Sequence, residues 1–163
     1  MSRLIRTTVR PAVAGDRADL DLIEQLAWTP STHPHSGQRP HDFGSRFSFD
    51  GTFVAQVRDQ VVGYASIGRA GSGPAQSHVW RLHSIAMRAE HRHQGLGREL
   101  LEAAEAFARE RDALKVKLRV LGTNLNAIAF YQRCGYSLEA RLVDEFQVAG
   151  RFVDELTMAR RIA

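Results

Sequence analysis

Residues 83–98 of this 163-residue chain read His-Ser-Ile-Ala-Met-Arg-Ala-Glu-His-Arg-His-Gln-Gly-Leu-Gly-Arg, and this stretch decides the fold. It begins in a β-rich run, passes through a turn that contains Gly95 and Gly97, and continues into a helical pattern. A turn that enters a helix directly leaves the first N–H groups of that helix without partners, and such groups bind anions. The stretch therefore predicts an anion site between a strand and a helix.

The segments on either side of this turn have opposite periodicities. Residues 79–87 predict a strand, and their apolar positions lose strict alternation in a way that indicates a bulge near His83 and Ser84. After Gly97, apolar residues recur at helical spacing to about Arg111 and predict a helix. The chain therefore changes from strand to helix across the glycines.

The remaining elements follow from the same patterns. Further strands are expected over residues 5–9, 53–57, 61–67, 116–120, 136–148 and 152–162, and further helices after residue 15 and from Asn124. Residues 29–50, with three prolines and few aliphatic residues, predict a long irregular connection with at most a short helix. This order indicates a mixed α/β sheet with helices on its faces, and residues 1–163 are expected to form a single domain.

Composition narrows the class of protein. The chain has one cysteine, Cys134, which allows no internal disulfide, and with no secretory leader we expect a cytoplasmic location. The net charge is +4 and the sequence pI is about 9.8, which favours anionic ligands. Because the basic residues are scattered and do not alternate with aromatic ones, we expect no nucleic-acid partner. The apolar runs are too short for a membrane span.

Three kinds of phosphate-binding turn contain two closely spaced glycines. The residues next to the glycines show which kind this chain matches. A P-loop places Lys and then Ser or Thr after its last glycine, where this chain has Arg98 and Glu99. A dinucleotide fingerprint requires a small residue where Leu100 stands. The pattern that remains is Arg-x-x-Gly-x-Gly.

That pattern resembles the GNAT superfamily of acetyl-CoA-dependent N-acetyltransferases, in which Arg/Gln-x-x-Gly-x-Gly/Ala joins a bulged strand to a helix. Here it reads Arg92-His93-Gln94-Gly95-Leu96-Gly97. A second motif of the family, Asn-x-x-Ala-x-x-x-Tyr-x-x-x-Gly-Phe, is matched at Asn124, Ala127, Tyr131 and Gly135, with Tyr136 in place of Phe. Together the two motifs cover about residues 79–136.

The resemblance implies a mostly antiparallel sheet, flanked by helices, in which strands 79–87 and 115–120 splay apart to admit acetyl-CoA. The pyrophosphate of the donor would be held by the backbone of residues 92–98, and its pantetheine arm would pair with residues 85–87. The implied donor-binding residues are Ile85, Ala86, Met87, Arg92, His93, Gln94, Gly95, Leu96, Gly97, Arg98, Asn124, Ala127 and Tyr131.

The resemblance also implies direct attack of a neutral primary amine on the thioester in a ternary complex. Tyr131 would protonate the departing thiolate, His83 would accept the proton of the amine, and the N–H of Met87 would stabilise the oxyanion. The last strands look like those of relatives that act on small amines such as amino acids, which favours a small molecule over a protein N-terminus or lysine. A non-catalytic CoA-binding module is the rival interpretation.

Several residues also have purely structural explanations. His83 could be hydrogen-bonded within a strand, Tyr131 could be a core aromatic residue, and Asn124 could only cap a helix. Cys134 is expected to be structural. His33, His35 and His41 lack ligand partners for a metal and would instead line or cover the acceptor pocket. The acidic residues of the last strands would bind a cationic substrate, contact a second subunit in a homodimer, or be solvated edge charges; they are Asp144, Glu145, Asp154 and Glu155.

Overall fold

Seven strands form one sheet in the order β1-β2-β3-β4-β5-β7-β6 in the computed structural model, which describes residues 7–27, 29–35 and 43–163. Every neighbouring pair is antiparallel except β4 and β5, which are parallel. The expected mixed sheet is therefore confirmed. The strands are β1 (Thr7–Pro11), β2 (Thr52–Val57), β3 (Gln60–Arg69), β4 (Val79–Met87), β5 (Lys115–Leu121), β6 (Ser137–Val148) and β7 (Arg151–Arg161).

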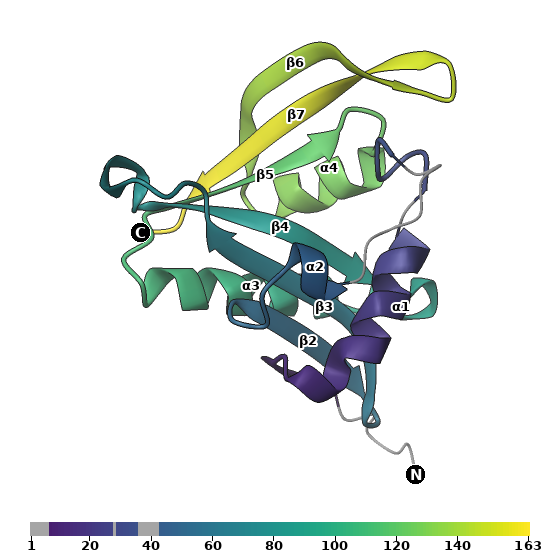
Figure 1. The fold of residues 1–163 in the computed structure, drawn as a ribbon, viewed down its shortest axis with the longest axis vertical. Helices are drawn as coiled ribbons and strands as arrows, with labels where there is room; N and C mark the ends of the chain where they lie inside the picture. The colour runs from purple at the N-terminus through teal and green to yellow at the C-terminus, as the bar shows by residue number, and fades with distance from the viewer. Residues whose placement is uncertain (1–6, 28, 36–42) are drawn as a thin grey trace.

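Helices cover both faces of this sheet (Figure 1). Successive side chains of a strand point to opposite faces, and in β2 Val54 packs with Leu20 and Phe43, whereas Phe53 and Ala55 pack in the cluster around α3. The α-helices are α1 (Arg17–Ala27) and α2 (Phe43–Arg46) on one face, and α3 (Leu96–Arg109) and α4 (Leu125–Arg133) on the other. Short 3-10 helices span Ala14–Asp16, Pro74–Gln76 and Ala89–His91. Within the described residues no helix is both long and apolar enough to cross a membrane.

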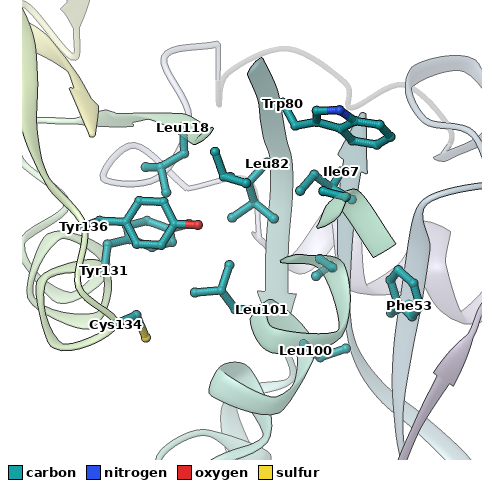
Figure 2. Packing of buried hydrophobic residues seen from close by; sticks show 14 of the residues in the cluster. Phe53, Ile67, Trp80, Leu82, Leu100, Leu101, Leu118, Tyr131, Cys134 and Tyr136 are labelled. Atoms are coloured by element: carbon teal, nitrogen blue, oxygen red, sulfur yellow. The ribbon is translucent and has the colours of Figure 1, made fainter. Parts of the chain in front are cut away.

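The larger core lies between the sheet and the pair α3 and α4. Leu100, Leu101 and Ala104 recur on one side of α3 and are at most 1% exposed, because helical spacing directs all of them at the sheet. Figure 2 shows this cluster, with Tyr131 and Tyr136 together at its α4 edge. The helix that carries the predicted anion site is thus anchored along its length.

Strands β4 and β5 separate soon after they begin. They pair only through Val79–Arg81 against Lys115–Lys117, so the rest of β4 has no neighbour on that side. On its other side β4 pairs Ser84 with Ser66 and Leu82 with Ile67, which leaves His83 as an extra residue. Both the splayed strands and the bulge at His83 are confirmed.

The boundaries differ from expectation at the N-terminal side. The first strand, expected over residues 5–9, is described from Thr7 and continues to Pro11, two residues further than expected, and residues 5 and 6 lie outside the described residues. Proline is accommodated there because β1 is an edge strand with one unpaired side. In its described residues, 29–35 and 43–50, the expected long connection holds one short α-helix, α2, and His41 lies outside these residues.

Candidate active site

A cleft of about 1380 Å³ opens where β4 and β5 diverge. One half is lined by β4, the loop before α3, and α4, and we call it the donor half. The other, which we call the acceptor half, is lined by α1, residues 29–35, α2 and the β6–β7 hairpin, which extends away from the helices (Figure 1). A smaller hollow of about 570 Å³ between α3 and β2 contains none of the predicted site residues.

The loop before α3 presents a row of unpaired backbone donors. His93 and Gly95 have positive φ angles of 61° and 86°, and α3 begins directly afterwards at Leu96. Within the described part of the chain, the N–H groups of residues 93–97 donate no hydrogen bond, whereas that of Arg98 donates to the carbonyl of Gly95 at 3.0 Å. Neighbouring amides in such a conformation form an anion-binding nest, to which the helix dipole adds. The N–H of Arg92 donates to the carbonyl of Ala89 at 3.2 Å, so within the expected segment 92–98 the free amides are those of residues 93–97.

Most of the predicted donor-site residues line the cleft, and two do not. The side-chain amide of Gln94 donates to the carbonyl of Glu90 at 3.2 Å, and the side chain of Leu96 is buried in the core. Neither side chain therefore lines the cleft, and these two residues could take part in a donor site only through their backbone. Arg92 and Arg98 line the cleft, and their guanidinium groups donate to the carbonyls of Met87 and Arg133 at 3.3 and 2.9 Å.

The edge of β4 offers backbone groups to the cleft. The N–H of Arg88 donates to the carbonyl of Val62 at 2.8 Å, and bonded pairs alternate along an antiparallel ladder. Ile85 and Met87 therefore direct their N–H groups away from β3, towards the side that β5 has left. An extended ligand can pair with this edge as an added strand would.

Tyr131 and Asn124 lie on α4 at the cleft. Burial, with a smaller contribution from Cys134, raises the pKa of Tyr131, which is 7% exposed. Its phenol therefore stays protonated at neutral pH and can donate a hydrogen bond. The side-chain oxygen of Asn124 accepts from the N–H of Ala127 at 3.2 Å, which confirms the helix cap and leaves the side-chain NH₂ group as a donor.

His83 is exposed at the cleft, and its ring packs over Gly68. A Cβ atom at position 68 would lie 2.7 Å from Nε2 of His83, and the ring centroid of Phe47 is 6.2 Å away. Partial desolvation, followed by the charges of Arg81 and Arg46, lowers the pKa of His83 below 6.5. The imidazole is thus neutral at pH 7 and able to accept a proton.

A buried polar cluster in the acceptor half was missed by the sequence reasoning. Glu24, only 2% exposed, accepts a hydrogen bond from the Tyr64 hydroxyl and forms an ion pair with Arg46. The same hydroxyl lies 2.9 Å from the hydroxyl of Ser84, beside the bulge. Burial and then Glu24 raise the pKa of Tyr64. The sequence offered one signal for this cluster. Glu24 follows the apolar Ile23 in an amphipathic helical pattern, so its carboxylate was a candidate for burial.

The remaining titratable candidates divide between the cleft and the core. His33 and His35 line the cleft, as expected, and desolvation, Arg46 and His35 lower the pKa of His33 to about 4. No group of His, Cys, Asp or Glu among the described residues could hold a metal ion. Cys134 is buried, and desolvation raises its pKa, so it is no ready nucleophile.

The acidic residues of the last strands have different surroundings. Asp154 pairs with Arg141, and Glu155, 8% exposed and lining the cleft, lies 3.5 Å from Arg119. Glu145 also lines the cleft but is exposed. Glu145 is therefore a solvated charge, whereas Glu155 is buried and paired.

The model of the acetyltransferase (GNAT) family matches residues 20–136, and the chain belongs to this family. It is 31% identical over 121 residues to streptothricin acetyltransferase of Streptomyces lavendulae, covering 74% of this chain and 59% of that protein. It is 37% identical over 65 residues to the uncharacterized protein YxbD of Bacillus subtilis, covering 40% of this chain and 41% of that protein. The matches thus span less than two thirds of both relatives.

Among solved structures, the fold is similar to that of yncA from Salmonella typhimurium, determined with its cofactor acetyl-CoA. The TM-score is 0.85 at 20% sequence identity, covering 97% of this chain and 95% of that one.

Proposed function

We propose that residues 1–163 form one N-acetyltransferase domain, which transfers an acetyl group from acetyl-CoA to the primary amine of a small molecule. The observation that carries this proposal is the row of free amides over residues 93–97, which opens on the same cleft as the unpaired edge of β4. One feature suits a diphosphate and the other suits an extended amide chain. Membership of the family supports the same activity.

The donor half fits acetyl-CoA. A Cβ atom at Gly95 would meet nothing within 4 Å, and His93, Gly95 and Gly97 line the cleft, so this loop borders open space that a phosphate group could enter. Arg92 and Arg98 add positive charge beside them, and the NH₂ group of Asn124 offers a further donor. On the open edge of β4, the N–H of Ile85 is available to a pantetheine amide and that of Met87 to the thioester carbonyl. Bound acetyl-CoA supplies the thioester carbonyl that the amine attacks.

The chain's own groups then move protons and stabilise charge. An alkyl amine with a pKa near 10 is neutral in only about a thousandth of its molecules at pH 7, so a base speeds the reaction. His83 accepts the proton that the ammonium form of the acceptor must lose, because its lowered pKa keeps the imidazole neutral at pH 7. The N–H of Met87 stabilises negative charge on the carbonyl oxygen, and Tyr131, held protonated by burial, donates its proton to the leaving sulfur.

The acceptor half favours a small molecule. Its walls are residues 29–35, Phe47 and the β6–β7 hairpin, where the ring of His35 lies 6.2 Å from that of Phe146. This contact brings the loop and the hairpin together over the cleft and narrows the approach for a folded protein. The relative named for streptothricin acetylation supports the same class of acceptor.

The test is a thiol-release screen with acetyl-CoA against amines, amino acids and peptides. We expect amine-dependent release of CoA, with a Tyr131→Phe variant that binds acetyl-CoA normally and turns over at least tenfold more slowly. Acetyl-CoA binding without release by any amine would identify a non-catalytic module, and preferred release by peptides would contradict the small-molecule acceptor.

A further inference from the structure

Arg81 is a cation in the cleft for which the described part of the chain supplies no counter-ion. It lies on β4 opposite Lys117, at the last pair before β4 and β5 diverge, and lines the cleft two residues before His83. Among the described residues none forms a hydrogen bond or ion pair with its guanidinium group, and its Nε atom is shielded from solvent with no acceptor. A buried donor left unsatisfied is costly, so this arrangement favours a ligand that supplies an acceptor.

The carboxylates among the described residues that line the cleft do not pair with Arg81. Glu24 pairs with Arg46, Glu155 pairs with Arg119, and Glu145 is exposed on the hairpin. As far as the described residues go, the acceptor half therefore has an uncompensated positive charge two residues from His83. The lowered pKa of His83, to which Arg81 contributes, reports the same positive field.

We propose that Arg81 binds a carboxylate of the acceptor, so that the acceptor is an amine with an anionic group, such as a free amino acid. This rests on the proposed function. A guanidinium group matches a carboxylate with two parallel hydrogen bonds, which fixes the orientation of the acceptor as well as its charge.

The spacing of the two residues suits one small acceptor. Two residues of a strand span roughly 6.6 Å, so a molecule whose carboxylate lies at Arg81 can place its amine near His83 when only a few bonds separate the two groups. Arg81 would then select acceptors that have a carboxylate, and His83 would accept the proton of their amine.

The kinetic test compares each amino acid that is acetylated with its α-carboxamide. Removal of a charged hydrogen-bonding group is expected to lower kcat/KM about 10- to 100-fold in the wild type. Arg81→Met should abolish this preference, mainly through KM for the carboxylate, and Arg81→Lys should restore part of it. Neither variant should change KM for acetyl-CoA.

The matched control is Arg69→Met, which removes the same charge from β3 at a residue outside the cleft, where Arg69 contacts Trp80 and the carbonyl of Ser77. It should keep the wild-type preference. If Arg81→Met retains the preference, or if Arg69→Met loses it equally, the carboxylate site is wrong while the acetyltransferase proposal stands.

A binding measurement decides the matter even if no amine is acetylated. With CoA saturating, so that the donor half is filled, oxalate is titrated into protein whose arginine side-chain Nε–H signals are followed by NMR. We expect a saturable shift of one signal that is missing in Arg81→Met. A titration in which that signal does not move would overturn the site, whereas absence of acetylation with a normal shift would overturn only the proposed function.

Discussion

At the scale of single residues, the site depends on where the backbone turns a side chain. His83 is the extra residue of a bulge, and its ring occupies space that exists because residue 68 is glycine. Neither the bulge nor Gly68 is itself proposed to contact a ligand. Both determine where the imidazole lies, and that position makes it a candidate base.

His83 leads to a prediction about pH. Its pKa in the folded chain is lowered below 6.5, so it is a competent base above that value and becomes protonated as the pH falls through its lowered pKa. We expect His83→Ala to reduce kcat/KM by about 10²-fold at pH 7.5. The ratio of wild-type to variant rates, in which titration of the amine cancels, should shrink below pH 6.5.

The control is Gly68→Ala, which keeps the imidazole but displaces its ring, and which should lower the rate less than His83→Ala. A ratio that stays constant from pH 5 to pH 8 would show that His83 accepts no proton in the reaction.

At the scale of elements, α4 joins a structural and a binding role in one residue. Asn124 caps the helix through its oxygen and keeps a donor group for the cleft. The two roles can be separated, because serine also caps helices but has no amide. The helix start and the donor site are therefore open to independent tests.

We expect Asn124→Ser to keep the free energy of unfolding and Asn124→Ala to lower it by about 1 kcal/mol. Both should weaken acetyl-CoA binding by roughly tenfold, because both lose the amide donor. Urea unfolding and calorimetric titration measure the two effects. Full affinity in the serine variant would assign Asn124 to the cap alone.

Elements were the most predictable part of the molecule, for local reasons. The bulge could be placed because Leu82 and Ile85 break the two-residue alternation, and the end of α4 could be placed because Gly135 has the left-handed conformation of a helix cap, with φ of 87°. The buried cluster of Glu24, Arg46 and Tyr64 depends on contacts between segments that are distant in sequence. No local pattern encodes such contacts, and the sequence reasoning missed them.

At the scale of the whole molecule, the cleft is assembled from both ends of the chain. The donor half comes from a continuous stretch of β4, a loop and α3, completed by α4, so two sequence motifs were enough to predict it. The acceptor half combines α1, residues 29–35 and the C-terminal hairpin, which meet only in the folded chain. The sequence therefore predicted the class of donor, but it did not predict Arg81 as a residue of the acceptor half.

A donor that bridges these parts should stabilise the whole chain. Acetyl-CoA at 100 times its Kd adds about 2.7 kcal/mol to the free energy of unfolding, which raises Tm by roughly 5–11 °C for a chain of this size. Differential scanning calorimetry measures the shift. Pantetheine at the same concentration, which lacks the diphosphate, should give a much smaller one, and equal shifts for both would remove the role of the amides at residues 93–97.

The central claim is that these free amides hold the diphosphate of CoA, and titration calorimetry of acetyl-CoA into Gly95 variants tests it most directly. Gly95 has φ of 86° and open space around it, and Asn and Asp both tolerate that conformation, so the two variants differ mainly in charge. We predict that Gly95→Asp weakens binding at least 100-fold and clearly more than Gly95→Asn, with the circular dichroism spectrum unchanged. Wild-type affinity in folded Gly95→Asp would contradict the account.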